Sequence, residues 1–287
     1  MLRYRIFWSA VVLAVAQCLL AGEKLQTGEG SFVFVDQKGN PKKPVTVWYF
    51  RPEAWRTSDP ILIVMHGMKR NGQAYREPWE PIATQHRALL IVPEFSTNLY
   101  SSMAYNQGGV GVEKDPAKWS FTLVENLFDH IRAATGATQT NYLLYGHSAG
   151  GQFVHRFVEF MPQARYKKAV AANPGYYTMP TFEKTYPYGF KESPMTEAQL
   201  EKVFTRPLTI LLGEQDIDPN APDLHRSPGA MEQGRFRLER GRNFFAAAQK
   251  LAQEKNWSFN WKMQTVPSIG HSNAGMTPAA AKVLFEK

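Results

Sequence analysis

One serine in the sequence has the surroundings that a catalytic nucleophile needs. Ser148 lies at the centre of residues 146–150 (GHSAG), which match the pattern Gly-x-Ser-x-Gly. An apolar run over residues 142–145 comes before it, and residues 153–161 carry apolar side chains at helical spacing. A strand, such a turn and a helix form a nucleophile elbow, in which a strained turn exposes the serine hydroxyl. The alternative is an incidental serine in a glycine-rich turn.

The glycines on either side of the serine have a steric reason to be there. Side chains at Gly146 or Gly150 are expected to collide with the neighbouring strand and helix. The same turn places the Ala149 N–H at a helix N-terminus, where an oxyanion can be received. A second N–H donor is expected in residues 66–68, after the apolar run 61–65, and the spacing points to Met68.

A serine nucleophile needs a general base, and a histidine base needs an acid that fixes its tautomer. His271 is the one histidine of seven in a loop after the last predicted strand. Asp216 follows the apolar run 208–212 and is the predicted acid, with Asp218 and Glu214 as close rivals. The sequence therefore predicts a triad that occurs in the chain order serine, aspartate, histidine.

The elements that must hold these residues alternate between strands and helices. Apolar or β-branched runs predict strands at residues 31–36, 45–50, 61–65, 88–92 (stopped by Pro93), 142–145, 168–172, 208–212 and 259–266. Apolar spacing and terminal signals predict helices at residues 79–86, 119–134, 153–161, 234–255 and 278–285. This alternation predicts an α/β fold with a mostly parallel sheet in a single domain over residues 23–287.

The first residues have the pattern of a secretory signal peptide. A basic start precedes an almost wholly apolar run at residues 6–20, and a small-residue site follows at residues 21–22. We therefore expect residues 1–22 to be removed and the protein to be secreted or periplasmic, without stable membrane association afterwards. An uncleaved anchor is the main alternative, but the run is shorter than the ~20 residues of a spanning helix. Cys18 follows Gln17 rather than a small residue, which disfavours a lipoprotein.

Composition excludes several other kinds of chemistry. Cys18 is the only cysteine, so the mature chain would have no thiol nucleophile and no cysteine-ligated metal. No H-E-x-x-H spacing is present, and we expect neither a metal nor a cofactor. The net charge is +8, but the arginines at 235, 237, 240 and 242 are typical of a solvated helix face. No recognition motif accompanies them, so nucleic acid is not an expected partner.

Residues 176–206 are rich in aromatic side chains but contain no clean strand pattern. The segment leaves the sheet after a strand beside the elbow, so we expect a lid-like insertion over Ser148. Tyr176 and Tyr177 follow the strand end and are predicted to line the substrate pocket. The alternative is that these rings only pack the insertion against the body of the protein.

From about residue 33 to the C-terminus, the sequence resembles the α/β-hydrolase-fold serine esterases. The motifs are residues 66–72 (HGMKRNG), 146–151 (GHSAGG), 213–216 (GEQD) and 270–272 (GHS). The resemblance is nearest to the secreted bacterial group of polyhydroxyalkanoate depolymerases and related carboxylesterases. It implies an α/β-hydrolase fold with the triad order seen here. Some hydrolases carry the acid after the preceding strand, where this chain has Asn173, and the disulfides and separate substrate-binding domain of many polyester enzymes are missing.

These observations predict hydrolysis of a carboxylic ester through an acyl-enzyme, with Ser148, Asp216 and His271 as catalytic residues. The partner is an ester substrate, either a small molecule or an oligomer or polymer. A peptidase or amidase would use the same triad, because both reactions share a tetrahedral intermediate. A non-catalytic binding protein on a hydrolase scaffold would lack a triad member, and here none is missing. The sequence leaves the oligomeric state open.

Overall fold

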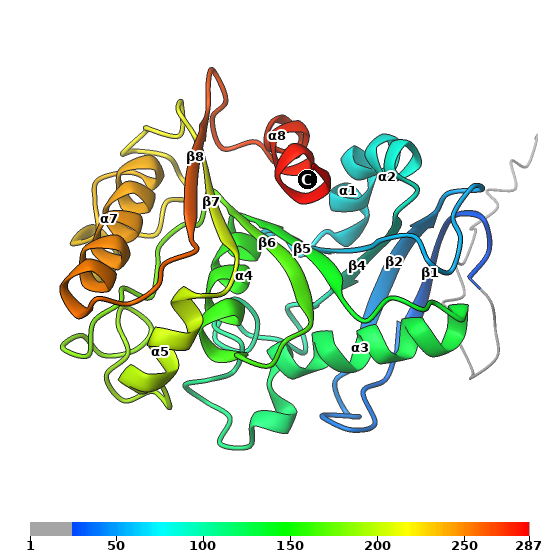
Figure 1. Ribbon diagram of the computed structural model, residues 1–287, viewed down its shortest axis with the longest axis horizontal. Helices are drawn as coiled ribbons and strands as arrows, with labels where there is room; N and C mark the ends of the chain where they lie inside the picture. Colours follow the sequence, from blue (N-terminus) through cyan, green and yellow to red (C-terminus); the bar gives the residue numbers. More distant parts are fainter. Residues whose placement is uncertain (1–24, 287) are drawn as a thin grey trace, which may run out of the picture.

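The computed structural model describes residues 25–286, so the predicted signal peptide at residues 1–22 lies outside the described residues. Eight strands form a sheet in the order β1-β2-β4-β3-β5-β6-β7-β8 (Figure 1). β2 pairs antiparallel with both β1 and β4, and all other neighbouring strands are parallel. The strands are β1 (Gly28–Phe34), β2 (Val45–Arg51), β3 (Ile61–Met65), β4 (Leu89–Glu94), β5 (Tyr142–His147), β6 (Tyr166–Ala172), β7 (Leu208–Gly213) and β8 (Lys262–Val266).

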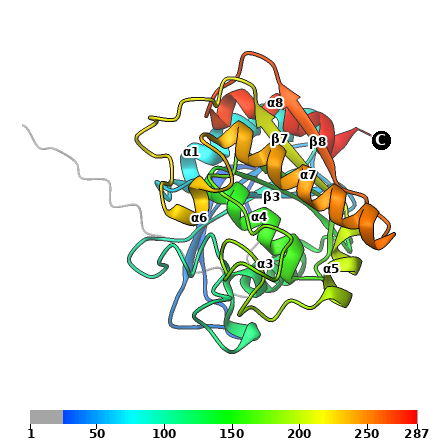
Figure 2. The same ribbon diagram turned by 90° about the vertical axis from the view of Figure 1, so that its left-hand side faces the viewer.

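Helices cover both faces of this sheet, which confirms the predicted α/β-hydrolase architecture (Figures 1 and 2). One face carries α1 (Gly72–Arg76), α2 (Glu80–His86) and α8 (Asn273–Phe285). The other carries α3 (Ser120–Thr135), α4 (Ala149–Phe160), α5 (Glu197–Phe204) and α7 (Arg237–Lys255). Short helices complete the list: α6 (Pro228–Met231) and the 3₁₀ turns η1 (Glu77–Trp79) and η2 (Pro116–Lys118). Among the described residues, no helix is long and apolar enough to cross a membrane.

The position of β3 in the sheet explains why all five of its residues are apolar. Its five residues are all buried, and successive side chains point to opposite faces of the sheet. Ile61, Ile63 and Met65 join the core beneath α3, α4 and α7. Leu62 and Val64 join the second core beneath α2 and α8. A parallel strand covered on both faces therefore needs apolar residues at every position.

Prolines do not end elements where the sequence predicts. β4 continues through Pro93, which lies opposite Val47 of β2. The pairing of β4 with β3 has already stopped at Ile91, so the missing proline N–H is not required by two neighbouring strands. α8 begins at Asn273 behind a Ser272 cap and contains Pro278 inside it, rather than starting there.

Helix α5 was not predicted, although its start is marked in the sequence. Thr196 accepts a hydrogen bond from the Gln199 N–H, and the Gln199 side chain accepts one from the Thr196 N–H. This is a capping box, which stabilises a helix N-terminus. This signal was not recognised in the sequence because aromatic side chains dominate residues 176–206. In the structure, residues 176–196 contain no helix and α5 forms the end of the segment.

Two glycines allow α4 to lie against the sheet. A Cβ atom at Gly146 would collide with the Gly150 carbonyl of α4, and one at Gly150 would collide with the Met65 carbonyl of β3. These partners are backbone atoms, which cannot move aside like the end of a flexible side chain. The predicted steric role of both glycines is therefore confirmed.

A methyl group at Gly150 should consequently separate α4 from β3. We expect Gly150→Ala to lower the free energy of unfolding by about 3 kcal/mol, because overpacking against fixed backbone is strongly destabilising. Gly111→Ala is the matched control, since a Cβ there meets only Tyr186 ring carbons at 3.4 Å and 3.5 Å. Urea denaturation of both variants checks the difference, and equal stability would contradict the close approach.

Candidate active site

The turn between β5 and α4 presents Ser148. Its backbone has a φ of +59° and a ψ of −117°, a conformation that a non-glycine residue rarely adopts. Ala149 is the first residue of α4, so its N–H has no acceptor within the helix. The strained turn and the helix N-terminus thus bring a hydroxyl and a free N–H donor together.

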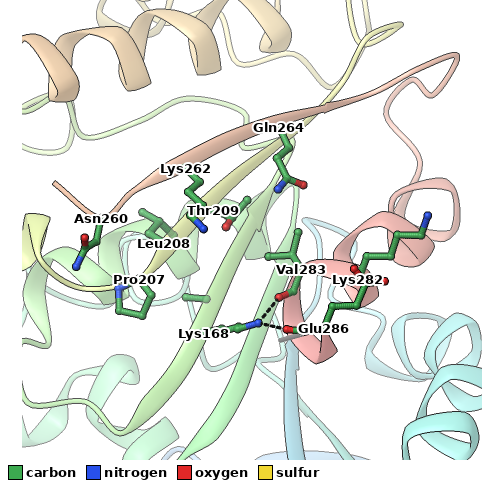
Figure 3. A pocket seen from close by; sticks show the side chains of 11 residues that line it. Lys168, Pro207, Leu208, Thr209, Asn260, Lys262, Gln264, Lys282, Val283 and Glu286 are labelled. Atoms are coloured by element: carbon green, nitrogen blue, oxygen red, sulfur yellow. Dashed lines mark hydrogen bonds between the residues drawn. The ribbon is translucent and has the colours of Figure 1, made fainter.

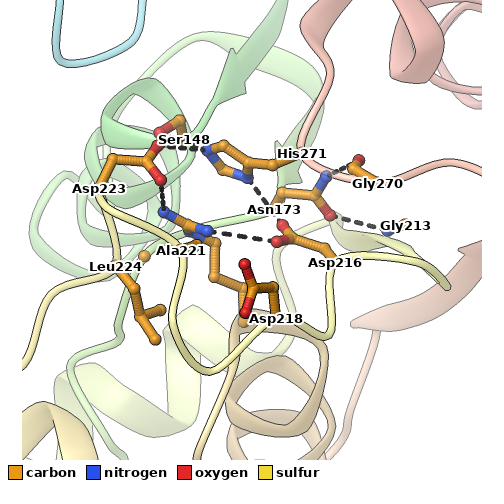
Figure 4. Close-up of polar contacts among 12 residues, drawn as sticks. Ser148, Asn173, Gly213, Asp216, Asp218, Ala221, Asp223, Leu224, Gly270 and His271 are labelled. Carbon is orange, nitrogen blue, oxygen red and sulfur yellow. Dashed lines mark hydrogen bonds and ion pairs between the residues drawn. The ribbon is translucent and has the colours of Figure 1, made fainter.

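Three side chains from separate segments meet at this turn (Figure 4). The Nε2 atom of His271 lies 3.0 Å from the Ser148 Oγ atom. The Nδ1 atom of the same ring lies 2.7 Å from Oδ2 of Asp216. With Nδ1–H donating to the carboxylate, Nε2 is left free to accept the serine proton. Asp216 follows β7 and His271 follows β8, so the carboxyl ends of neighbouring parallel strands place both.

The rival acids lie elsewhere. Asp218 is exposed, and its carboxylate accepts a hydrogen bond from the Asn220 N–H. Glu214 accepts a hydrogen bond from the Thr265 hydroxyl. Of Asp216, Asp218 and Glu214, only Asp216 forms a hydrogen bond with the His271 ring within residues 25–286.

Asn173, after β6, joins the two loops that carry the acid and the histidine. Its side-chain oxygen accepts a hydrogen bond from the Gly213 N–H at 2.7 Å. Its side-chain nitrogen donates to the Gly270 carbonyl at 3.1 Å. Gly213 ends β7 and Gly270 comes directly before His271, so this buried amide fixes the spacing between both loops.

The turn after β3 contains the second predicted oxyanion residue, Met68, whose side chain lines the same pocket as Ser148. His66 holds this turn. Its Nδ1–H donates to the Gly67 carbonyl, and its Nε2 accepts the Phe95 N–H. Burial lowers the pKa of His66 from 6.5 to about 3, so the ring stays neutral. Its role is to shape the backbone.

A cavity of about 670 Å³ opens above Ser148. Two of its walls are loops, one within residues 102–111 and the other within residues 222–226. The third wall comes from the aromatic segment and contains Tyr176, Tyr186 and Tyr188. The first part of the aromatic segment therefore lines this cavity together with two loops that the sequence did not single out.

The two tyrosines predicted to line the pocket have different positions. Tyr176 lines it, with its ring 4.7 Å from that of His225. Tyr177 does not: it is buried in the core, stacked on Phe244 at 4.4 Å. Both residues follow β6 after a bend, and the backbone there turns one ring toward the cavity and the other into the core. The prediction for Tyr177 therefore has to be corrected.

Sequence reasoning missed two residues beside the predicted triad, Arg237 and Asp223. The Arg237 guanidinium is 2% exposed and lies 3.3 Å from Oδ1 of Asp216 and 3.0 Å from Oδ1 of Asp223. Arg237 and Arg240 are both buried, so the prediction that this arginine patch is a solvated helix face is wrong for them. Nothing in the spacing of Asp223 and Arg237 indicated that they would pair.

A further hollow, of about 380 Å³, lies at the opposite edge of the sheet (Figure 3). Lys168, Leu208 and Lys262 line it at the amino ends of their strands. The Lys168 ammonium donates to the Val283 and Glu286 carbonyls and so fastens the end of α8.

In residues 25–286, no group of three or more His, Cys, Asp or Glu side chains is placed to bind a metal ion.

Comparison with known proteins identifies two similar structures across nearly the whole chain. Poly(aspartic acid) hydrolase-1 from Sphingomonas sp. KT-1 is 45% identical with a TM-score of 0.88, covering 91% of this chain and 100% of that chain. LpqC, a poly(3-hydroxybutyrate) depolymerase from Bordetella parapertussis, is 36% identical with a TM-score of 0.87, covering 91% and 90%.

An S-formylglutathione hydrolase from Agrobacterium tumefaciens shares the fold at 14% identity, with a TM-score of 0.58 over 92% of this chain and 98% of its own. No family model and no curated protein matches the chain. At 45% and 36% identity over 91% of this chain, the first two structures show the family to which it belongs. The chain therefore belongs to the α/β-hydrolase-fold esterases, in the group that includes the polyhydroxyalkanoate depolymerases, and is a hydrolase.

Proposed function

We propose that the protein hydrolyses carboxylic esters through an acyl-enzyme formed on Ser148. The observation that carries this proposal is the hydrogen-bonded series from Asp216 through His271 to Ser148, with distances of 2.7 Å and 3.0 Å. The serine of this series sits on a strained elbow, which supports its role as the nucleophile. A structural serine would need neither the strain nor the base.

In the first step, Nε2 of His271 takes the Ser148 proton as Oγ attacks the ester carbonyl. Asp216 holds the Nδ1–H and stabilises the imidazolium that forms. The same imidazolium then protonates the departing alcohol, which leaves the acyl group on Ser148. Water attacks this ester in the second step, gives its proton to His271 and releases the acid.

The oxyanion of each tetrahedral intermediate would be bound by the backbone N–H groups of Ala149 and Met68. Ala149 supports this role because its N–H lies at the start of α4, where helix N–H groups lack internal acceptors. Met68 supports it because its turn borders the same cavity as Ser148. Each donor of this kind is worth about 3 kcal/mol of transition-state stabilisation.

The substrate class that we propose is an ester of an oligomeric or polymeric acid. The cavity of about 670 Å³ exceeds what a short acyl group fills and has tyrosines along one wall. Two similar proteins are named for polymer hydrolysis, one of them acting on poly(3-hydroxybutyrate), a polyester.

An amidase is the second candidate, because the other similar protein is named for poly(aspartic acid), whose units are joined by amide bonds. Turnover of p-nitrophenyl esters and of aminoacyl anilides separates the two candidates. Faster turnover of the esters, at equal acyl group, supports the first.

The chain outside the site enters the proposal as well. We propose that residues 1–22 are a signal peptide and that residues 23–287 form a single secreted or periplasmic domain. The basic start and apolar run of the sequence support this assignment. Mass spectrometry of the N-terminus after expression in a bacterial host tests it, and a retained Met1 would contradict cleavage.

The nucleophile is tested by Ser148→Ala. We expect the variant to lose labelling by a fluorophosphonate probe and kcat to fall by roughly 10⁴ or more, because the acyl-enzyme cannot form. The wild-type protein, labelled in parallel, is the positive control. Persistent labelling of the variant would place the nucleophile elsewhere.

The acid is tested by comparing two aspartates that are two residues apart. Asp216→Asn should lower kcat on the order of 10⁴-fold, because an amide cannot hold the His271 tautomer in the same way. Asp218→Asn should have little effect, because within residues 25–286 the hydrogen bond of that side chain is with the Asn220 N–H and not with the His271 ring. Steady-state kinetics of both variants give the ranking, and the reverse order would exclude Asp216.

Two adjacent tyrosines allow a role in the substrate pocket to be distinguished from a role in core packing. Tyr176→Ala should change the ratio of kcat/KM between short and long acyl esters. The reason is that each methylene of the acyl chain contributes about 0.8 kcal/mol of binding free energy only where a pocket wall buries it. Tyr177→Ala should instead lower the free energy of unfolding by about 3 kcal/mol and leave that ratio unchanged. An unchanged ratio in the Tyr176 variant would show that its ring does not contact the acyl chain.

A further inference from the structure

Asp223 faces the reacting atoms of the site although it is not part of the triad. Its Oδ2 atom lies 3.8 Å from Nε2 of His271, the nitrogen that also contacts Ser148 at 3.0 Å. Its side chain is 46% exposed and lines the cavity above the serine. The His271 imidazole therefore has a carboxylate near each nitrogen, Asp216 at Nδ1 and Asp223 at Nε2.

We propose that Asp223 positions the water molecule that attacks the acyl-enzyme and so favours hydrolysis over transfer of the acyl group to an alcohol. This inference rests on the proposed function, because it requires an acyl group on Ser148. It adds a water-positioning residue to the proposed reaction.

The distances suit a bridging water. A gap of 3.8 Å is too long for a direct hydrogen bond between Nε2 and Oδ2. Water oxygen lies about 2.8–2.9 Å from each acceptor in ordinary hydrogen bonds, and a triangle with those sides closes over a gap of this size. A water held there gives one hydrogen to Nε2 and the other to Oδ2. Its lone pair is then free to attack the acyl carbon on the adjacent Ser148.

Arg237 fixes which oxygen of Asp223 does this. The guanidinium binds Oδ1 at 3.0 Å and leaves Oδ2 toward His271. Partial burial raises the pKa of Asp223, but the charge and hydrogen bond of Arg237 outweigh it, so the pKa lies below its ordinary value. The carboxylate is therefore ionised at neutral pH and is a strong acceptor.

The same placement discriminates between acyl acceptors. Water has two hydrogens, one for His271 and one for Asp223. An alcohol has a single O–H, which must go to Nε2 for proton transfer, so its carbon would face the charged Asp223 oxygen and displace that hydrogen bond. The balance of the step is unchanged in either case: the acyl–Oγ bond breaks, the new acyl–oxygen bond forms, and one proton passes through Nε2 to Oγ.

The partition of a single acyl-enzyme between water and methanol tests this role. The enzyme is acylated with a p-nitrophenyl ester in aqueous methanol, and the free acid and the methyl ester are quantified by chromatography. Damage to Asp216 or His271 slows both products equally, because both acceptors use the same base. Only a change near the acceptor alters the ratio.

Asp223→Asn is the sharpest variant. Arg237 should bind the amide oxygen and turn the amide N–H₂ toward Nε2, which puts a donor where water needs an acceptor. We expect the ratio of methyl ester to acid to rise about tenfold, as for loss of a hydrogen bond to a charged group. Asp223→Ala should raise it similarly, and Asp218→Asn, in the same loop, should leave it at the wild-type value.

The outcomes distinguish this role from the proposed function. If Asp223→Asn and Asp223→Ala remain labelled by a fluorophosphonate but keep the wild-type ratio, the role of Asp223 is overturned and the function stands. Equal loss of both products without a change in ratio also overturns it, because the residue would then act only through Arg237 and Asp216. A wild-type protein that releases no p-nitrophenol and takes up no label overturns both.

Discussion

The contact between the backbone of α4 and the backbones of β3 and β5 is the constraint on which the site depends. Ser148 occupies a conformation that costs about 1–3 kcal/mol, and something must hold it there. All twelve residues of α4 are buried, so the packing of the helix on both sides supplies that energy. Gly146 and Gly150 let the helix approach closely enough for this packing to form. The strain at the serine and the burial of the helix are thus parts of one arrangement.

The charges beside the elbow form a compact group. Arg237 is buried between Asp216 and Asp223, and an unpaired ion in that position would cost about 3–5 kcal/mol. Two carboxylates and one guanidinium carry a net charge of −1. The imidazolium that forms on His271 therefore meets the same net charge as it would beside one aspartate, although two acidic side chains surround the ring. The second carboxylate can be present without an excess of negative charge.

Much of the fold and part of the site could be predicted from local patterns in the sequence. The continuous apolar run of β3 and the elbow glycines could be read from the sequence because each depends on near neighbours. The different positions of Tyr176 and Tyr177 could not be predicted, because both residues follow a bend after β6 whose course no sequence pattern gives. The pairing of Arg237 with Asp223 depends on how a loop folds back onto the start of α7. No spacing along the chain encodes that contact, so only the structure reveals it.

Asn173 has a consequence for the motions of the site. One buried amide binds Gly213 and Gly270 at once, so the loops that carry Asp216 and His271 are cross-linked at their bases. Thermal displacement of either loop is therefore transmitted to the other, and the acid and the histidine move as one body. Ser148 is joined to the same point, because its N–H donates to the carbonyl of Ala172, the residue before Asn173. The serine, the aspartate and the histidine are therefore all anchored by hydrogen bonds around the end of β6, which keeps the three segments in register without a covalent cross-link.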